Sequence, residues 1–375
     1  MKIAIVCDDL IQFGGAEKVV EAVAEVWPKA PIYTSVASSK WQEVLGKRGV
    51  KLTTSFMQKV PFAVKLNRYY SPFLLHILAM QNFDFSQFDV VLSLSSRYAH
   101  FIITKPSTKH ICYMHSPGRM FWEPFDYFEK ESFGALAPLR KIGNEFLKPP
   151  SLVIRILDYI SAQRVDCYLA NSKTTSDRVA RYYGKHAHVL YPFVDLKEFV
   201  GAGSKAKEGG YFLIISRLAS WKKIEIAIEA CESLGVPLKI AGVGPDLNRL
   251  KEYAGKNTEF LGYVDGKKKR NLICGCRALI NTQFEDFGIV PLEAMACGKP
   301  VIAFAKGGAL ETLLSEKTGE FFYKQDSPEL IRVLGKFDPR KYNPQDCIFR
   351  ASEFSKEKFQ REVEQFVNNV YLKNS

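Results

Sequence analysis

The sequence of 375 residues contains no long hydrophobic run, and none of its apolar stretches approaches the roughly 18 residues that a membrane-spanning helix needs. The amino terminus passes from Met1-Lys2 into a short apolar run at 3–6, which is too short for the hydrophobic core of a secretion signal. Disorder is excluded as the main state, because 47% hydrophobic residues can offset the entropy lost on folding. We therefore expect a folded, cytoplasmic protein of two or three domains, since one domain takes roughly 150 residues.

Cysteine patterns that hold metals or disulfide frameworks are also absent. The eight cysteines are scattered without a C-x-x-C motif, and only Cys274 and Cys276 lie close together. This spacing predicts free thiols in a reducing cytosol and no zinc site. No D-x-D follows a predicted strand, and Asp8-Asp9 lacks the spacing that would hold a divalent metal.

Several signatures of other enzyme classes are missing. No G-x-G-x-x-G follows the first predicted strand, which removes the main support for a dinucleotide-dependent oxidoreductase. The Asp286-Phe287-Gly288 string is found in kinases, but neither an H-R-D loop nor a glycine-rich loop accompanies it. Glycoside hydrolysis needs two carboxylates that face each other across the scissile bond, and the spacing of Glu285 and Glu293 does not predict that arrangement.

Acidic residues are outnumbered by basic ones. The sequence has 52 Lys and Arg against 40 Asp and Glu, a net charge of +12 that favours anionic partners. No nucleic-acid recognition module is present, so we expect no nucleic-acid partner. No Asp or Glu occurs from 44 to 83, and basic and apolar residues interleave there: Lys47, Arg48, Lys51, Phe56, Met57, Lys59, Val60, Phe62, Val64, Lys65, Leu66, Arg68, Tyr69 and Tyr70. This composition suits an anionic membrane surface, and equally an aromatic core face whose lysines reach solvent.

Strand-like apolar runs alternate with helical patterns along the chain, which predicts doubly wound α/β domains. The runs lie at 2–7, 90–94, 110–113, 167–170, 211–216, 238–241, 278–281 and 300–303. Gly, Lys and small residues dominate 200–210, as is typical of a linker. We therefore expect one domain at 1–199 and a second at 200–355 with a ligand cleft between them, and an amphipathic helix in 356–375 that packs back on the first domain.

Two carboxylates mark the most specific motif. Glu285 falls in the loop after the strand at 278–281, and Glu293 lies inside a helix that Pro291 can open. The loop and the helix N-terminus present backbone N–H groups to an anion, while carboxylates accept hydrogen bonds from hydroxyls. The pair suits a sugar and a ribose on either side of a diphosphate. The alternative is that Glu293 merely complements the helix dipole and Glu285 is a loop charge.

Two cations and a glycine pair complete the candidate site. Arg217 and Lys222 follow the strand at 211–216 and can neutralise a diphosphate leaving group. Taken alone, they could equally be solvated loop cations. Gly14-Gly15 lies between the first strand and the first helix, where glycine lets the backbone approach a ligand closely.

Together these segments resemble glycosyltransferase family 4, whose retaining enzymes have the GT-B fold, with two Rossmann-like α/β domains facing each other across a cleft. The resemblance covers almost the whole chain and is carried by 14–17, 113–119, 170–172, 191–195, 216–222, 242–245, 285–293 and 307–312. The motifs at 115–119, 286–291 and 307–312 are most similar to bacterial GDP-mannose-dependent mannosyltransferases of polysaccharide and O-antigen assembly.

The resemblance implies a role for each site residue. The donor diphosphate would be held by Arg217 and Lys222, with Gly14 and Gly15 close to it. The transferred sugar and its phosphate would meet Glu285 and the backbone N–H groups of Phe287, Gly288 and Ile289, and Glu293 would hold the ribose. His115 would lie near the transferred sugar, and Arg119 near the phosphates or the acceptor. Asp9 and Val243 depart from the family pattern, which leaves the acceptor and base contacts open.

The resemblance therefore implies a hexosyltransferase, specifically a mannosyltransferase. It would need neither cofactor nor metal, because Arg217 and Lys222 supply the positive charge. The expected partners are a nucleotide-sugar donor, a glycan or polyprenyl-diphosphate-linked acceptor, and an anionic membrane at the inner face of the plasma membrane. The alternatives are a UDP-sugar transferase, an epimerase, a phosphorylase, or a nucleotide-sugar-binding partner without turnover.

Overall fold

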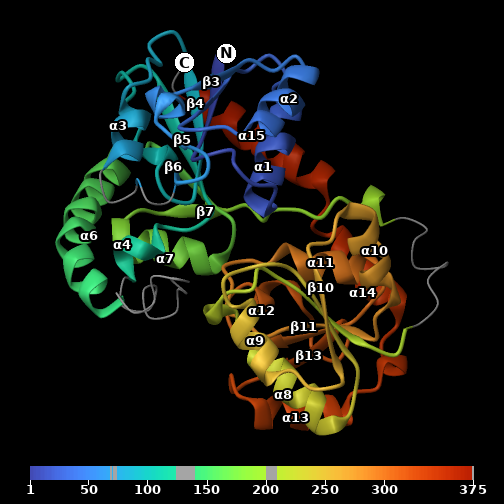
Figure 1. Cartoon of the computed structure of the whole chain (residues 1–375). Coiled ribbons are helices and arrows are strands. Elements are labelled where there is room, and N and C mark those ends of the chain that lie inside the picture. Colours follow the sequence, from blue (N-terminus) through green and yellow to red (C-terminus); the bar gives the residue numbers. More distant parts are fainter. Residues whose placement is uncertain (68–69, 71–73, 124–139, 200–208, 374–375) are drawn as a thin grey trace. The chain divides into compact units, whose positions relative to one another are not determined.

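The computed structural model describes residues 1–67, 70, 74–123, 140–199 and 209–373. These residues form two compact units, each built around a parallel sheet with helices (Figure 1). Of the described residues, unit 1 contains those in 1–123, 141–191 and 357–373, and unit 2 contains Arg140, 192–199 and 209–356. Nearly all of the linker expected at 200–210 lies outside the described residues. The predicted fold class, with two doubly wound α/β parts, is confirmed.

Within the described residues, unit 1 has a seven-stranded sheet in the order β3-β2-β1-β4-β5-β6-β7. Its strands are β1 (Ile3–Cys7), β2 (Ile32–Thr34), β3 (Leu52–Thr54), β4 (Val90–Ser95), β5 (Lys109–Met114), β6 (Cys167–Ala170) and β7 (Ala187–Val189). Every residue of β1 and β4 is buried, as expected for apolar runs covered on both faces. Strands β2, β3 and β7 were not predicted, because three residues carry too little pattern.

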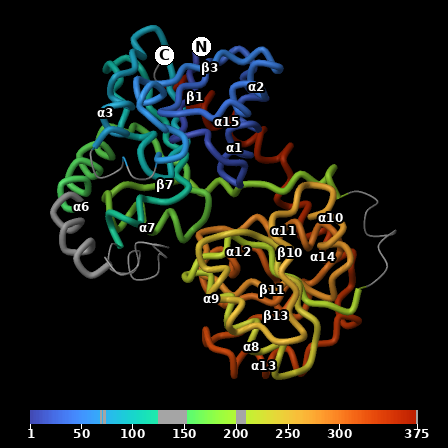
Figure 2. Tube along the Cα trace, viewed as in Figure 1, coloured from blue at the N-terminus to red at the C-terminus, as the bar shows by residue number. Residues whose placement is uncertain are grey.

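The helices of unit 1 include the last helix of the chain. They are α1 (Gly15–Val26), α2 (Ser39–Lys47), η1 (Phe56–Lys59), α3 (Leu75–Gln81), η3 (Ala99–Phe101), α4 (Arg119–Trp122), α6 (Arg140–Gln163), α7 (Lys173–Tyr183) and α15 (Lys356–Leu372). Helix α15 lies beside α1 (Figure 2), where the Gln360 side chain donates to the Ala22 carbonyl at 3.0 Å. The Phe359 ring packs edge-on against Tyr113, with ring centres 5.8 Å apart. The apolar stripe of α15 thus extends the core of unit 1.

In the described part of unit 2, a six-stranded sheet has the order β10-β9-β8-β11-β12-β13. Its strands are β8 (Phe212–Ile215), β9 (Leu238–Ala241), β10 (Thr258–Gly262), β11 (Ala278–Asn281), β12 (Val301–Phe304) and β13 (Gly319–Phe322). Its helices are η5 (Leu196–Glu198), η7 (Ser220–Lys222), α8 (Ile224–Leu234), α9 (Leu247–Tyr253), α10 (Gly266–Gly275), α11 (Ile289–Ala296), α12 (Ala309–Thr312), α13 (Ser327–Lys336), η8 (Pro339–Lys341) and α14 (Pro344–Ser352). The strand order reverses between β8 and β11, where doubly wound sheets bind ligands.

Helix α11 begins at Ile289, two residues earlier than the start expected at Pro291. Pro291 is accommodated because the first turn of a helix leaves its N–H groups without intrahelical partners, so a missing N–H removes no bond. The shift places Glu293 in the second turn of α11, with its side chain buried.

The expectation of free thiols is wrong for one cysteine pair. Cys274, near the end of α10, forms a disulfide with Cys297, which follows α11 directly. The two residues are 23 positions apart in sequence, and only the packing of α10 beside α11 brings their Cα atoms to 5.2 Å. Sequence spacing cannot reveal such a pair, because it depends on tertiary contact.

The positive charge of the acid-free stretch at 44–83 is partly neutralised in the structure. Arg48 pairs with Glu21 at 2.9 Å and with Glu25 at 3.8 Å, and Lys47 pairs with Glu43 at 2.6 Å. These partners come from α1 and α2, outside the acid-free stretch. The acid-free stretch of sequence is therefore not an acid-free surface.

Candidate functional site

Unit 2 brings one predicted cation and one predicted carboxylate together. Strands β8 and β11 pair in parallel, with Phe212 opposite Ala278, so the loops after them leave the same edge of the sheet. Lys222 lies in the loop after β8 and Glu285 in the loop after β11, and their side chains form an ion pair. The pairing joins two motifs that are 63 positions apart in sequence.

Lys222 is not a solvated loop cation, the alternative left open by the sequence. Its side chain is only 8% exposed, and the ammonium lies 4.0 Å from the centre of the Trp221 ring. Its carbonyl accepts a hydrogen bond from the Thr282 hydroxyl at 2.7 Å. Arg217 differs, because its side chain is exposed just beyond β8. One cation is thus fixed at the sheet edge and the other can reach a ligand.

The loop that carries Glu285 is held by the glycine motif at 307–308. The Gly308 N–H donates to the Glu285 carbonyl at 3.0 Å, and Glu285 and Gly307 form a parallel bridge. A Cβ atom on Gly308 would lie 2.2 Å from the carbonyl oxygen of Phe287. Only glycine allows this approach, so the motif at 307–312 supports the motif at 285–293.

Gly288 turns the chain from this loop into α11. It is the N-cap residue and has φ of 87°, a conformation that favours glycine. A Cβ atom here would lie 2.7 Å from a carboxylate oxygen of Glu285. The Phe287 ring is buried and packs on Phe354, with ring centres 5.7 Å apart. The side chain of Phe287 anchors the loop, which leaves the backbone of Phe287, Gly288 and Ile289 as the part suited to an anion.

Glu293 has a specific partner, so it is more than a charge that complements the dipole of α11. Its carboxylate forms an ion pair with Lys269 of α10, and the two side chains are 3% and 24% exposed. The sequence did not single out Lys269. It lies in the basic run 267–270, and nothing in that run marks which residue faces α11.

In unit 1, the glycine pair opens helix α1. Gly14 is the N-cap residue, and its N–H donates to the Glu17 carboxylate at 3.0 Å. Burial raises the pKa of Glu17 to about 7, and the nearby Asp9 carboxylate contributes in the same direction. The glycine loop is therefore tied to a carboxyl group that titrates near neutral pH.

The raised pKa of Glu17 makes stability depend on pH. Between its ordinary pKa of 4.5 and about 7, the folded chain retains a proton that the unfolded chain has released, so stability falls as pH rises. Glu17→Gln should remove this fall and stabilise the protein by about 3 kcal/mol at pH 8 relative to wild type. Urea unfolding at pH 5 and pH 8 measures the difference. The exposed Glu43→Gln is the matched control, and equal pH profiles for all three proteins would contradict the prediction.

His115 and Arg119 follow strand β5 in unit 1. The backbone N–H of His115 donates to the Ser95 carbonyl at 2.8 Å. The His115 ring lies edge-on to Tyr113, with ring centres 5.1 Å apart. Burial lowers the pKa of His115 to about 4, so at neutral pH the ring is an uncharged hydrogen-bonding group. Arg119 is the first residue of α4 and is partly exposed.

Sequence reasoning assigned no site role to Asp8 and Asp9, the two carboxylates that follow β1. Asp8 accepts hydrogen bonds from four successive backbone N–H groups at 96–99, at 2.6 to 3.0 Å. Asp9 accepts from Arg97 at 2.7 Å and from Asn67 at 2.5 Å. These bonds fix the loop after β4 against the end of β1. The only available signal was their position directly after the first strand.

The structure joins Lys222 to Glu285, and Glu293 to Lys269, inside unit 2. It places Gly14, Gly15, His115 and Arg119 after strands of unit 1. The ligand roles of all these residues remain predictions.

Two family profiles match consecutive parts of the chain. The profile described as Glycosyltransferase Family 4 matches residues 13–198, and the profile described as Glycosyl transferases group 1 matches residues 197–337.

Curated relatives include mannosyltransferases. An alpha-1,3/1,6-mannosyltransferase of Dictyostelium discoideum is 47% identical over 204 residues, covering 41% of this chain and 48% of the relative. The human protein of the same name is 28% identical over 248 residues, covering 55% of this chain and 59% of the relative. The chain thus spans about half to three fifths of the length of these relatives.

Solved structures share the fold over nearly the whole chain. Anabaena HepE in complex with UDP has a TM-score of 0.70 at 17% identity, covering 98% of this chain and 100% of that one. Sucrose-phosphate synthase from Thermosynechococcus elongatus has a TM-score of 0.73 at 16% identity, covering 98% of this chain and 99% of that one. At these identities, the likeness is one of fold.

Proposed function

Because the chain belongs to glycosyltransferase family 4, we propose that it is a retaining hexosyltransferase that transfers mannose from GDP-mannose. The proposed acceptor is a glycan or polyprenyl-diphosphate-linked glycan of cell-surface polysaccharide biosynthesis. The observation that carries the proposal is the Lys222–Glu285 pair, which sets a fixed cation and a carboxylate at the strand-order reversal of unit 2. Similarity to mannosyltransferases supports mannose. The UDP complex of HepE motivates a UDP-sugar as the alternative donor.

The chemistry needs positive charge where the diphosphate departs. Cleavage of the sugar–phosphate bond builds oxocarbenium character on the sugar and negative charge on the leaving phosphate. Arg217 and Lys222 would stabilise that phosphate, and the backbone N–H groups at 287–289 would add hydrogen bonds. An ammonium has three N–H donors, so Lys222 can contact Glu285 and a phosphate oxygen together. Retention follows if the leaving phosphate takes the acceptor proton on the same face of the sugar.

Carboxylates would orient the two hydroxyl-rich parts of the donor. Glu285 would accept hydrogen bonds from hydroxyls of the transferred sugar, and Glu293 from the ribose. The neutral ring of His115 suits a hydrogen bond to a sugar hydroxyl, and Arg119 suits a phosphate or the acceptor. Gly14 and Gly15 would let the backbone approach the diphosphate. We propose that no metal takes part, because Arg217 and Lys222 supply the charge that a divalent ion would otherwise bring.

The acceptor is proposed to be reached at an anionic membrane on the cytoplasmic side. Phe56, Phe62 and Val64 are 40%, 71% and 38% exposed, and Lys59 and Lys65, which are close to them in sequence, are exposed too. Met57 and Ala63 are buried, so only part of the acid-free stretch faces solvent, and Arg68 and Tyr69 lie outside the described residues. Among the helices of the described residues, none combines the length and hydropathy needed to cross a bilayer. Co-sedimentation with liposomes that does not rise with anionic lipid would contradict this surface.

A transfer assay tests the function directly. Purified protein is incubated with radiolabelled GDP-mannose, UDP-glucose or UDP-N-acetylglucosamine, each with and without a polyprenyl-diphosphate-linked glycan and with and without a chelator. We expect label in the lipid fraction from GDP-mannose, with an unchanged rate in chelator. Transfer from a UDP-sugar but not from GDP-mannose would identify a UDP-sugar as the donor and contradict mannose transfer. An epimerised sugar nucleotide or a sugar phosphate would indicate an epimerase or phosphorylase. Binding without turnover or donor hydrolysis would indicate a non-catalytic partner.

A further inference from the structure

The ion pair between Lys269 and Glu293 lies in the interior of unit 2. The Glu293 side chain is 3% exposed and that of Lys269 is 24% exposed. An ionised carboxylate removed from water needs a counter-charge in contact with it. Lys269 provides that contact, although it belongs to a different helix.

Helix α10 is attached to α11 in a way that fixes this contact. The Asp265 side chain caps its first turn by accepting from the Lys268 N–H at 3.3 Å. The disulfide between Cys274 and Cys297 joins its last turn to the residue that follows α11. Ile273, one helical turn beyond Lys269 on the same face, is fully buried. Neighbouring Lys268 is exposed, so the basic run of α10 directs one side chain at α11.

We propose that Lys269 is a positioning residue for the nucleoside half of the donor, an inference that rests on the proposed function. Lys269 contacts Oε2 of Glu293 and thereby restrains the position of that oxygen. A carboxylate held in one orientation accepts hydrogen bonds from the vicinal hydroxyls of a ribose without first losing rotational freedom. Lys269 thus acts through Glu293 on the nucleoside, whereas Arg217 and Lys222 act on the diphosphate.

This division of roles predicts that replacing Lys269 weakens the binding of nucleotides but not the binding of inorganic diphosphate. In Lys269→Met, the affinity of the full chain for GDP and UDP should fall roughly tenfold, as expected for one lost partner of a coupled pair. The affinity for inorganic diphosphate should stay unchanged, because diphosphate does not reach Glu293. The KM for the donor should rise while kcat changes little. Isothermal titration with the three ligands and initial-rate kinetics measure these effects.

Matched variants distinguish a positioning role of Lys269 from a general disturbance of the fold. Lys268→Met removes the same charge from the neighbouring exposed position and should bind all three ligands as wild type does. Lys269→Arg keeps the charge and should recover most of the nucleotide affinity. Glu293→Gln should weaken nucleotide binding by itself, and adding Lys269→Met to it should weaken binding no further. If Lys269→Met does not fold, Lys269→Gln, which keeps a polar contact, takes its place in the titrations.

The outcomes distinguish this inference from the proposed function. Wild-type protein that binds neither GDP nor UDP and transfers no sugar would overturn the proposed function itself. Wild-type protein that binds a nucleotide, together with a Lys269→Met variant that binds it equally well, would overturn the role of Lys269 alone. Equal loss of nucleotide and inorganic diphosphate in a folded Lys269→Met variant would also overturn it.

Discussion

Arg217→Ala is expected to lower the turnover of the proposed transfer by about two orders of magnitude, as for other lost groups that stabilise developing negative charge. Arg217 lies just beyond β8 with its side chain exposed, so its loss should leave the core of unit 2 intact. Lys222 cannot take over the role of Arg217, because contacts with Glu285 and Trp221 hold its ammonium at one place on the sheet edge. Initial rates with radiolabelled GDP-mannose measure the loss, and thermal unfolding checks the fold.

The control for this variant is Arg340→Ala in the same unit. The Arg340 side chain is 88% exposed and pairs with Asp338 at 3.0 Å. An exposed pair of this kind contributes little to stability, so transfer and unfolding should both stay at wild-type levels. Near-normal transfer by Arg217→Ala, or an equal loss in Arg340→Ala, would refute the assignment of Arg217 to the diphosphate.

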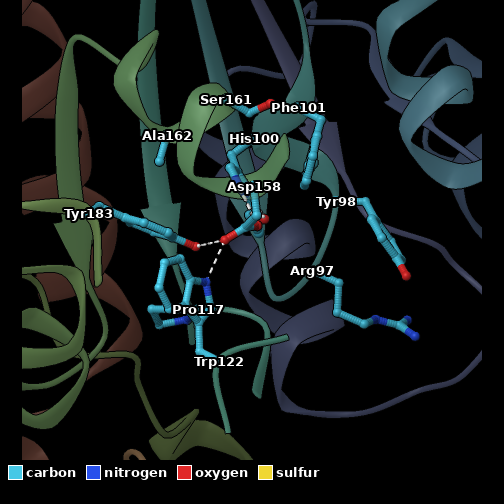
Figure 3. Close-up of polar contacts among 12 residues, drawn as sticks. Arg97, Tyr98, His100, Phe101, Pro117, Trp122, Asp158, Ser161, Ala162 and Tyr183 are labelled. Atoms are coloured by element: carbon cyan, nitrogen blue, oxygen red, sulfur yellow. Dashed lines mark hydrogen bonds and ion pairs between the residues drawn. The ribbon is translucent and has the colours of Figure 1, made fainter. Parts of the chain in front are cut away.

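Asp158→Ala is expected to destabilise the fold by about 3–5 kcal/mol, the usual cost of removing one partner from a buried charged network. Its carboxylate is fully buried and accepts from the Trp122 indole at 2.7 Å and the Tyr183 hydroxyl at 2.8 Å. It also contacts the His100 ring nitrogen at 3.0 Å. These side chains converge on Asp158 from α4, α7 and η3 (Figure 3). Removing the carboxylate leaves the Trp122 indole and the Tyr183 hydroxyl without this acceptor.

Urea unfolding measures the loss of stability in Asp158→Ala, and two further variants serve as comparisons. Asp158→Asn keeps the volume and one acceptor oxygen, so it should lose less stability and remains measurable if the alanine variant does not fold. Asp177→Ala removes an exposed carboxylate from α7 in the same unit and should change stability by no more than about 0.5 kcal/mol. Equal stability of Asp158→Ala and Asp177→Ala would show that the buried network does not stabilise unit 1.

The parts of the fold that were predicted well are those with a strong local signal. Strands β6, β9 and β11 have the bounds that the apolar runs predicted. The helical stripe of 356–371 became α15, with Phe359, Val363 and Val367 buried. Strands β2, β3 and β7 were missed, because a run of three residues does not rise above its surroundings, and the edge strands β10 and β13 of unit 2 were missed as well. Helix α6 was missed too, since its sequence contains Pro149-Pro150, which normally marks the end of a helix.

The candidate site likewise has residues that the sequence indicated and contacts that only the structure shows. Sequence motifs led to Glu285, Glu293, Arg217 and Lys222, because strand-loop-helix patterns place chemistry at the ends of strands. No pattern in the sequence indicated that Lys222 would pair with Glu285, or that Lys269 would meet Glu293. Such pairs join loops and helices that are distant along the chain, and their formation depends on which strands become neighbours.

The sequence by itself determined the class of fold, the motifs that resemble glycosyltransferase family 4, and the residue types available for a diphosphate and its hydroxyl-rich flanks. These follow from local periodicity and from spacing within single loops. Only the tertiary structure decided which charges neutralise one another, including Arg48 with Glu21, and which cysteines meet, Cys274 with Cys297. Charge pairing and burial depend on distances through space, and those distances are set by strand order and helix packing.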